Sequence, residues 1–303
     1  MSILIWSKRI VIFGALFFLI DFGISELLLK GLNKYFGLHS NAKMLVNGSS
    51  MSLAGFNKAE IESASHKSIA FYARNGVSLE DRNTMLEHYF DTTTQKTEIV
   101  ILEVNPLLFS KRFTAANVYM LFLPFMDEPS MEGFIKSKTT FKDYWVRKLV
   151  RTSRYNVDLF SVSLKGYLGM YENKKTQILD ANSLEGLKGQ VNSVPVEFDA
   201  DKVALLKKTI ALVEKNSKKI ILVNMPIFES KMKTFKYDEY QVFISFIKKY
   251  AQSHHNILFL DLNQQQITSD PKLFSDPLHV NDQGQIKVSE TLIQFIAANG
   301  LDK

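Results

Sequence analysis

The stretch Met44-Leu45-Val46-Asn47-Gly48-Ser49-Ser50 is typical of a short buried strand that ends in a glycine turn. Four more apolar runs bounded by turn residues follow, at 68–73, 98–104, 219–224 and 257–261. Helical patterns lie between or after them, at 57–64, 79–89, 201–216, 240–253 and about 283–298. Short apolar strands that alternate with helices are typical of a parallel sheet covered on both faces. We therefore predict an α/β fold with a doubly wound, mostly parallel five-stranded sheet.

The composition excludes several classes of protein and site. The chain has 303 residues, of which 46% are hydrophobic and 22% charged, and these globular fractions exclude disordered, collagen-like and low-complexity chains. The absence of cysteine excludes a disulfide scaffold, a thiolate zinc site, an iron–sulfur cluster and a cysteine nucleophile. Length alone is compatible with two domains or with one large α/β domain.

The net charge of +6 is concentrated in one region. Residues 134–175 contain ten bases and three acids, a net charge of +7, so the rest of the chain is nearly neutral. Such a patch suits an acidic membrane surface, an anionic polymer or nucleic acid. Since no nucleic-acid-binding motif accompanies it, we predict a patch that faces lipid or polymer, and no nucleic-acid partner.

The N-terminal segment predicts a membrane anchor. Lys8 and Arg9 precede an apolar run over 10–29, and 20 helical residues span a hydrocarbon core of about 30 Å. Asp21 and Glu26 interrupt the run, and a central Asp costs about 2.5–3.5 kcal/mol, so we expect a partner to cover Asp21. The preceding bases predict a cytoplasmic N-terminus. Residues 1–30 are thus predicted to anchor the chain in the inner (cytoplasmic) membrane, with residues 40–303 on the periplasmic or extracellular side.

Two other interpretations of this segment remain open. Residues 10–20 have the length of a signal-peptide core, and Gly23-Ile24-Ser25 fits a cleavage site, although Leu27, Leu28 and Leu29 prolong the apolar run past it. Cleavage would also export the remainder. The third interpretation is a buried core helix, which nothing earlier in the chain supports.

A long insertion interrupts the alternation of strands and helices. Residues 109–200 separate the third and fourth strands, and they contain the basic patch and an apolar run at 118–126. Connections of this length are usually functional or carry structure of their own. The apolar run is either a buried helix of the insertion or a surface that faces membrane or partner.

Polar residues follow the strands where parallel strands present their carboxyl ends. Ser50 follows the first strand at a glycine turn, which is a geometry that exposes a serine nucleophile. Asp276 and His279 precede the last helix, and this spacing lets the carboxylate reach the imidazole that accepts the serine proton. Gly76 follows the second strand and Asn105 the third, and both residue types supply hydrogen bonds to an oxyanion.

At this point the sequence resembles the SGNH (GDSL-like) hydrolase superfamily. The resemblance covers 44–105 and 219–298, and it implies an SGNH, flavodoxin-like domain that contains the 109–200 insertion. Gly48-Ser49-Ser50 matches the family's Gly-Asp-Ser, which makes Ser50 the nucleophile. The resemblance further implies a triad completed by Asp276 and His279, and an oxyanion hole built from the Ser50 amide, Gly76 and Asn105. It implies neither a cofactor nor a metal.

The sequence departs from the family pattern at three positions. Ser49 replaces the usual Asp, and Glu103 and Pro106 stand where Gly and Asp are common. These departures question the oxyanion geometry, and they leave Ser49 open as an alternative nucleophile. They also motivate a second hypothesis, in which the chain is a catalytically inactive scaffold or binding protein of an envelope acylation complex.

The anchor, the Gly-Ser-Ser tripeptide and the insertion resemble one branch in particular. This branch comprises membrane-anchored D-alanyl transfer proteins of teichoic acid synthesis and SGNH partners of polysaccharide O-acylation. The resemblance implies an extracytoplasmic serine acyltransferase or esterase that acts through an acyl-enzyme. Its partners would be the lipid bilayer, a membrane-bound O-acyltransferase, an acyl donor and a glycan or polyol-phosphate acceptor.

Overall fold

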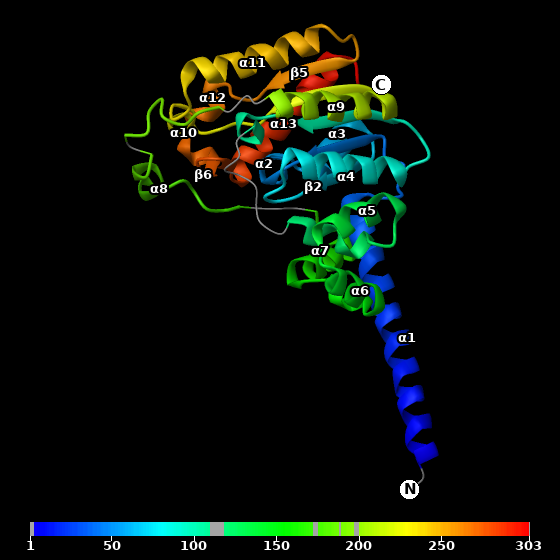
Figure 1. Cartoon of the computed structure of the whole chain (residues 1–303). Helices are drawn as coiled ribbons and strands as arrows, with labels where there is room; N and C mark the ends of the chain where they lie inside the picture. Colours follow the sequence, from blue (N-terminus) through cyan, green and yellow to red (C-terminus); the bar gives the residue numbers. More distant parts are fainter. Residues whose placement is uncertain (1–2, 110–117, 172–174, 188, 197–199, 303) are drawn as a thin grey trace. The chain divides into compact units, whose positions relative to one another are not determined.

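The computed structural model describes residues 3–109, 118–171, 175–187, 189–196 and 200–302 (Figure 1). The chain forms two compact units. One comprises residues 37–116 and 171–303 and contains the sheet; the other comprises residues 1–36 and 117–170 and is helical. The α/β unit is described first.

A five-stranded, entirely parallel sheet forms the centre of the α/β unit, and its strand order is β2-β1-β3-β4-β5. This confirms the predicted fold class. The strands are β1 (Met44–Gly48), β2 (Ile69–Ala73), β3 (Thr97–Glu103), β4 (Ser217–Asn224) and β5 (Ile257–Asp261). The side chains of β1 and β2 are buried throughout, as expected for strands covered on both faces.

Two layers of helices cover the sheet. Helix α4 packs on α9, and α13 packs on α2 and α3 (Figure 1). Local capping fixes where these helices begin, since Asn57, Ser78 and Asn281 each accept hydrogen bonds from backbone amides of the first turn. The main helices of the unit are α2 (Ser50–Gly55), α3 (Lys58–Ser65), α4 (Leu79–Asp91), α9 (Ala200–Asn216), α11 (Tyr237–Gln252) and α13 (Asp282–Ala298).

Several short elements were not predicted. The helix α2 begins directly after β1, and a two-stranded antiparallel hairpin, β6 (Phe274–Asp276) with β7 (His279–Val280), precedes α13. The remaining short helices are η1 (Pro106–Phe109), α8 (Ala181–Glu185), α10 (Glu229–Met232), α12 (Gln265–Thr268) and η5 (Pro271–Leu273). The hairpin matters most, because it carries both Asp276 and His279.

The helical unit combines the N-terminal helix with the central part of the insertion. Helix α1 (Ile3–Phe36) extends beyond the apolar run at both ends. The apolar run at 118–126 forms the buried 3-10 helix η3 (Val118–Phe125), in which Phe122, Leu123 and Phe125 are buried. The other elements are α5 (Pro129–Lys138), α6 (Phe141–Leu149), η4 (Arg151–Arg154) and α7 (Val157–Leu168).

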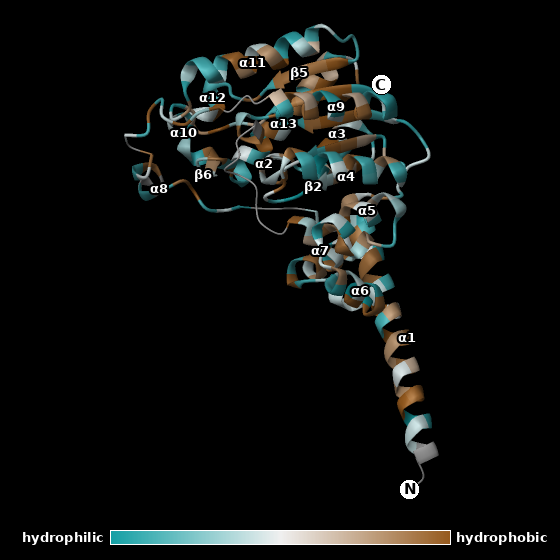
Figure 2. Ribbon diagram, in the orientation of Figure 1, coloured by the Kyte–Doolittle hydropathy of each residue, from teal (hydrophilic) through white to brown (hydrophobic). Residues whose placement is uncertain are grey.

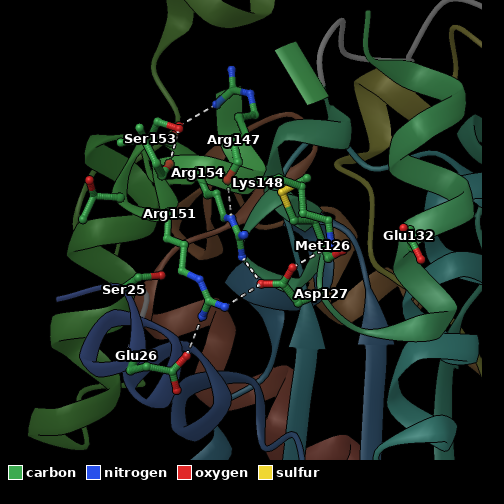
Figure 3. A network of polar contacts seen from close by, with 12 residues as sticks. Ser25, Glu26, Met126, Asp127, Glu132, Arg147, Lys148, Arg151, Ser153 and Arg154 are labelled. Carbon is green, nitrogen blue, oxygen red and sulfur yellow. Dashed lines mark hydrogen bonds and ion pairs between the residues drawn. The ribbon is translucent and has the colours of Figure 1, made fainter. Parts of the chain in front are cut away.

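Within this unit the insertion covers Asp21. The Asp21 carboxylate accepts hydrogen bonds from the Arg151 amide (2.6 Å), the Thr152 amide (3.0 Å) and the Thr152 hydroxyl (2.5 Å), and the residue is 4% exposed. Figure 3 shows the adjoining network, in which Arg151 reaches Glu26 and Arg154 reaches Asp127. The acid that interrupts the apolar run is therefore paired inside its own chain.

Helix α1 is the one helix in the described part of the chain that is long and apolar enough to cross a membrane. Apolar residues continue along it in Figure 2, and most of its apolar side chains before Leu27 are exposed. A membrane-spanning helix has this composition and this exposure.

Candidate active site

The polar residues that follow the strands gather at the carboxyl edge of the sheet. The strand order reverses at β1, because β2 and β3 pair on its two sides. Ser49 and Ser50 follow β1, and Glu103 and Asn105 lie at and just beyond the end of β3. Ligands of doubly wound sheets bind at such a reversal point.

The two adjacent serines have different surroundings. The Ser49 hydroxyl donates to Glu103 Oε1 (2.7 Å) and accepts from the Met51 amide (3.2 Å), so it caps α2. The Ser50 hydroxyl lies 2.8 Å from His279 Nε2. A Ser49 hydroxyl engaged on both sides is held away from the imidazole, and Ser50 is the serine that contacts it.

Ser50, His279 and Asp276 form a continuous hydrogen-bonded chain. His279 Nδ1 lies 2.9 Å and 2.8 Å from the two carboxylate oxygens of Asp276. This contact places the proton on Nδ1, because a carboxylate accepts, and it leaves Nε2 to accept the Ser50 proton. Such a chain is able to transfer a proton from the hydroxyl to the imidazole as the oxygen attacks a carbonyl carbon.

The Asp276 carboxylate is held ionised. Burial alone would raise its pKa, but the hydrogen bond and charge of His279, the Leu278 amide (2.9 Å) and Lys175 (3.5 Å) together lower the pKa of Asp276 to about 2. The His279 amide also donates to this carboxylate (3.0 Å). The hairpin thus fixes the carboxylate by its backbone as well as by the imidazole.

The buried carboxylate of Glu103 holds the turn that carries Ser49 and Ser50. The residue is 1% exposed, and its carboxylate accepts five hydrogen bonds. The donors are the amide and hydroxyl of Ser49 (2.8 and 2.7 Å), the amide and hydroxyl of Ser52 (3.2 and 2.6 Å) and the Asn105 side-chain amide (2.6 Å). A single carboxylate therefore connects the turn that carries Ser50 to the segment that carries Asn105.

The one sequence signal for this role is Glu103 itself, a carboxylate at a position where the resembled pattern commonly has glycine. A carboxylate at the carboxyl end of a buried strand needs several donors, and Ser49 and Ser52 supply them. Gly48 is required for the approach, because a β-carbon there would contact Ser52 Oγ and lie 2.7 Å from Glu103 Oε2.

A buried arginine supports the same layer. Arg82 of α4 is 0% exposed and donates to the Asn47 side chain (3.1 Å), the Asn47 carbonyl (3.0 Å) and the Glu103 carbonyl (2.7 Å). Burial lowers the pKa of Arg82, and the negative charge of Glu103 opposes that shift. The two charges compensate each other beneath the site.

Gly76 and Asn105 line the same cleft as Ser50 and His279, a hollow of about 210 Å³. Gly76 has a φ of +71°, a backbone conformation that glycine adopts without strain. The Asn105 side-chain oxygen accepts from the Leu107 and Leu108 amides (2.9 and 3.1 Å), which fixes its amide nitrogen toward Glu103. Lys202 of α9 also lines the cleft and pairs with Glu80.

No cluster of three or more metal-ligating side chains occurs among the residues that the structure describes. The pair His254-His255 lies beyond the end of α11, where the His254 ring stacks on Tyr250 at 4.4 Å. Neither histidine lines the cleft, and both lie just after the end of a helix.

No protein-family model matches the sequence, and no curated protein matches it. Several solved structures are similar to this chain over most of its length, at low sequence identity. They include a structure provisionally described as a platelet activating factor from Streptococcus pneumoniae (12% identity, TM-score 0.45, 92% of this chain and 96% of that chain). A second is a provisionally described acylhydrolase from Bacteroides fragilis (13% identity, TM-score 0.41, 86% of this chain and 88% of that chain). A third is a catalytic mutant of an acetylxylan esterase from Geobacillus stearothermophilus (13% identity, TM-score 0.41, 84% of this chain and 93% of that chain).

Proposed function

We propose that the protein is a serine-dependent acyl transferase or esterase of the SGNH type that works through an acyl-enzyme. The observation that carries the proposal is the 2.8 Å contact between Ser50 Oγ and His279 Nε2, with Asp276 on the other ring nitrogen. Of the serines in the described cleft, Ser50 has the base that a hydroxyl nucleophile requires.

The reaction has two steps in this proposal. Ser50 Oγ attacks the acyl carbonyl while His279 takes its proton, and His279 then returns that proton to the departing alkoxide. An ester bond to Ser50 forms and the donor ester bond breaks. An acceptor hydroxyl, deprotonated by His279, attacks the acyl-enzyme; the ester bond to Ser50 breaks as His279 gives the proton to Ser50 Oγ, and a new ester bond joins the acyl group to the acceptor. Water in place of the acceptor makes the reaction a hydrolysis.

The oxyanion of each tetrahedral intermediate would be held by the Ser50 amide, the Gly76 amide and the Asn105 side-chain amide. Asn105 has two amide hydrogens; Glu103 takes one, and the second is available for the oxyanion. The carboxylate of Glu103 thereby orients an oxyanion donor as well as the nucleophile turn.

The acceptor and the location are part of the same proposal. The span of α1 and the bases before it favour a single-pass protein of the inner membrane with the α/β unit outside the cytoplasm. Lys202 lines the cleft with its ammonium paired to Glu80, and in this proposal an anionic acceptor such as a polyol phosphate or an acidic glycan competes with Glu80 for that ammonium. This arrangement is similar to that of teichoic acid D-alanyl transfer proteins, with a membrane-bound O-acyltransferase as the source of the acyl group.

Turnover of an activated ester by paired serine variants tests the proposal. We expect Ser50→Ala to lose activity by roughly 10³-fold or more, as happens when a triad nucleophile is removed. Ser49→Ala is the comparison variant: it leaves the Ser50–His279 contact in place but removes the cap of α2 and one donor to Glu103, so we expect a loss of activity well below that of Ser50→Ala. Equal activity of wild type and Ser50→Ala would overturn the proposal and favour the inactive scaffold. Slow hydrolysis that a polyol-phosphate acceptor accelerates would identify a transferase.

A further inference from the structure

An apolar ridge lies exposed on the helical unit. We define it by Phe141, Trp145 and Leu149 of α6 and by Val157, Phe160, Leu164 and Leu168 of α7. Exposure ranges from 48% at Trp145 to 84% at Val157. The α7 members repeat every three or four residues and therefore share one face of that helix.

The opposite face of α7 packs on α1. Leu159, Ser163 and Gly166 are buried there, and the Ser163 hydroxyl donates to the Leu28 carbonyl of α1 (2.8 Å). Tyr155, just before α7, donates to the Ser25 carbonyl (3.0 Å) and Tyr167 to the Leu27 carbonyl (2.7 Å). The ridge is therefore attached to the part of α1 that follows Asp21, within one compact unit.

The depth of Asp21 in the bilayer indicates what surrounds the ridge. If the charges of Lys8 and Arg9 mark one boundary of the hydrocarbon core, Asp21 lies 12 residues further, at about 18 Å by the helical rise. The core is about 30 Å thick, so Asp21 would lie well inside it, and tilt of α1 moves Asp21 further from the distal boundary and closer to the middle of the core. The amides of Arg151 and Thr152 that bond Asp21 must lie at the same depth.

We propose that the ridge is embedded in the membrane leaflet distal to Lys8 and Arg9, so that the insertion enters the bilayer beside its own anchor. This inference rests on the membrane span of α1. The start of η4 meets Asp21, and α6 leads directly into η4, so the α6 members of the ridge reach the depth of the acyl chains. Helix α7 contacts Leu27, Leu28 and Gly31 of α1, which the same rise places about 27–33 Å from Arg9, so its members lie at the headgroup boundary of that leaflet. Exposed apolar side chains at these depths meet lipid.

The surrounding charges fit a lipid occupant. Lys142 and Lys165 lie next to ridge residues on α6 and α7, and long basic side chains reach headgroups while their stems stay in the apolar layer. The exposed acids Asp143 and Asp158 lie in the first turns of the same helices and must reach the headgroups as well. The acids Asp21 and Asp127 are paired with η4 and its neighbours, so they do not oppose insertion. Trp145 lies among the ridge residues, and tryptophan is enriched at membrane interfaces.

The two tryptophans of the chain make the test direct, because Trp6 lies on α1 and Trp145 on the ridge. The full chain is reconstituted in vesicles of phosphatidylcholine and phosphatidylglycerol, with the phosphatidylcholine brominated either near the headgroup end or near the methyl end of its chains. Trp6→Phe leaves Trp145 as the only reporter, and Trp145→Phe leaves Trp6. Aqueous iodide is the complementary quencher.

We expect Trp145 to lose emission to bromine near the headgroup end more than to bromine near the methyl end, and to be protected from iodide. A Trp145 that iodide quenches and bromine does not would overturn the proposal, as would a Trp145 shielded by protein from both quenchers. Trp6 precedes Lys8 and reports only the near interface, so a third reporter, Phe17→Trp in a chain whose Trp6 and Trp145 are both replaced by Phe, separates the two failures. Bromine quenching at position 17 without quenching of Trp145 keeps the anchor and removes the embedded ridge, whereas quenching at neither position removes the anchor as well.

Discussion

The Ser49 hydroxyl and the Glu103 carboxylate are joined by a 2.7 Å hydrogen bond, which holds the first serine of the pair beneath the cleft. The neighbouring Ser50 hydroxyl contacts His279 instead. Ser49 follows β1 and Glu103 ends β3, so this bond connects the ends of two adjacent strands.

Glu103→Gln tests this role. The glutamine side chain would bring an NH₂ donor to a site where five donors already point at Glu103. We expect kcat to fall while KM changes little, because Glu103 does not line the cleft. Unfolding should be easier by about 1–3 kcal/mol, the typical cost of unsatisfied buried polar groups. Steady-state kinetics and urea titration measure both quantities.

Glu98→Gln is the matched control for that experiment, since it removes a carboxylate from the same strand away from the cleft. Its kcat should remain near wild type. A Glu103→Gln enzyme with wild-type kcat would show that the carboxylate does not position Ser50 or Asn105.

Asp276→Asn should reduce kcat by roughly 10²–10⁴-fold, because an asparagine oxygen or amide no longer enforces the Nδ1 proton on His279. KM is expected to change little. The pKa of Asp276 is lowered to about 2, so its own protonation begins only in strong acid and does not contribute to a loss of activity near pH 5. A wild-type pH profile of kcat in Asp276→Asn would contradict the relay.

Lys202→Met tests the charge of the cleft. We expect KM for an anionic acceptor to rise several-fold, with little effect on a neutral activated ester. Lys208→Met is the matched control, since Lys208 lies on the same helix but does not line the cleft. Equal effects on anionic and neutral substrates would argue against an anionic acceptor.

The acid stability of the protein should depend on Glu98. Hydrogen bonds from Lys43 and Lys67 (2.9 Å each) lower the pKa of Glu98 from 4.5 to about 2. A carboxylate with a depressed pKa stabilises the folded state above its unfolded pKa, and this contribution disappears as the pH falls from about 4.5 toward 2. The free energy of unfolding should therefore decrease through that range, and less steeply in Glu98→Gln.

Glu290→Gln, on an exposed position of α13, should leave that pH dependence unchanged. Urea unfolding at a series of pH values provides the measurement. A Glu98→Gln protein with the same slope as wild type would show that the two lysine contacts do not stabilise the fold.

The sheet was predictable because buried parallel strands are continuous apolar runs, and β5 was predicted at its observed bounds of Ile257–Asp261. The β6–β7 hairpin was not predictable. Its pairing is two to three residues long, and its residues Asp276 and His279 belong to the candidate site and do not indicate a strand. Helix α2 is too short for periodicity to indicate it. Its first turn is held by the Ser49 cap and by Glu103, whose carboxylate accepts from the Ser52 amide 51 residues away in the sequence.

The contacts made by the insertion could also not be predicted in full from the sequence. The sequence indicated that Asp21 needs a partner but not which residues provide it, because two of the three donors are the backbone amides of 151 and 152. Backbone amides carry no sequence signature. The apolar run at 118–126 was recognisable as helical or surface-facing, and packing within the helical unit decides that it is buried.

The most direct test of the central claim is to locate the adduct of a fluorophosphonate on the folded full-length protein by peptide mass spectrometry. The proposed relay predicts a single adduct on Ser50 that is absent from His279→Ala and still forms in Ser49→Ala. An adduct on Ser49, labelling that survives His279→Ala, or no adduct on protein that unfolds cooperatively would contradict it.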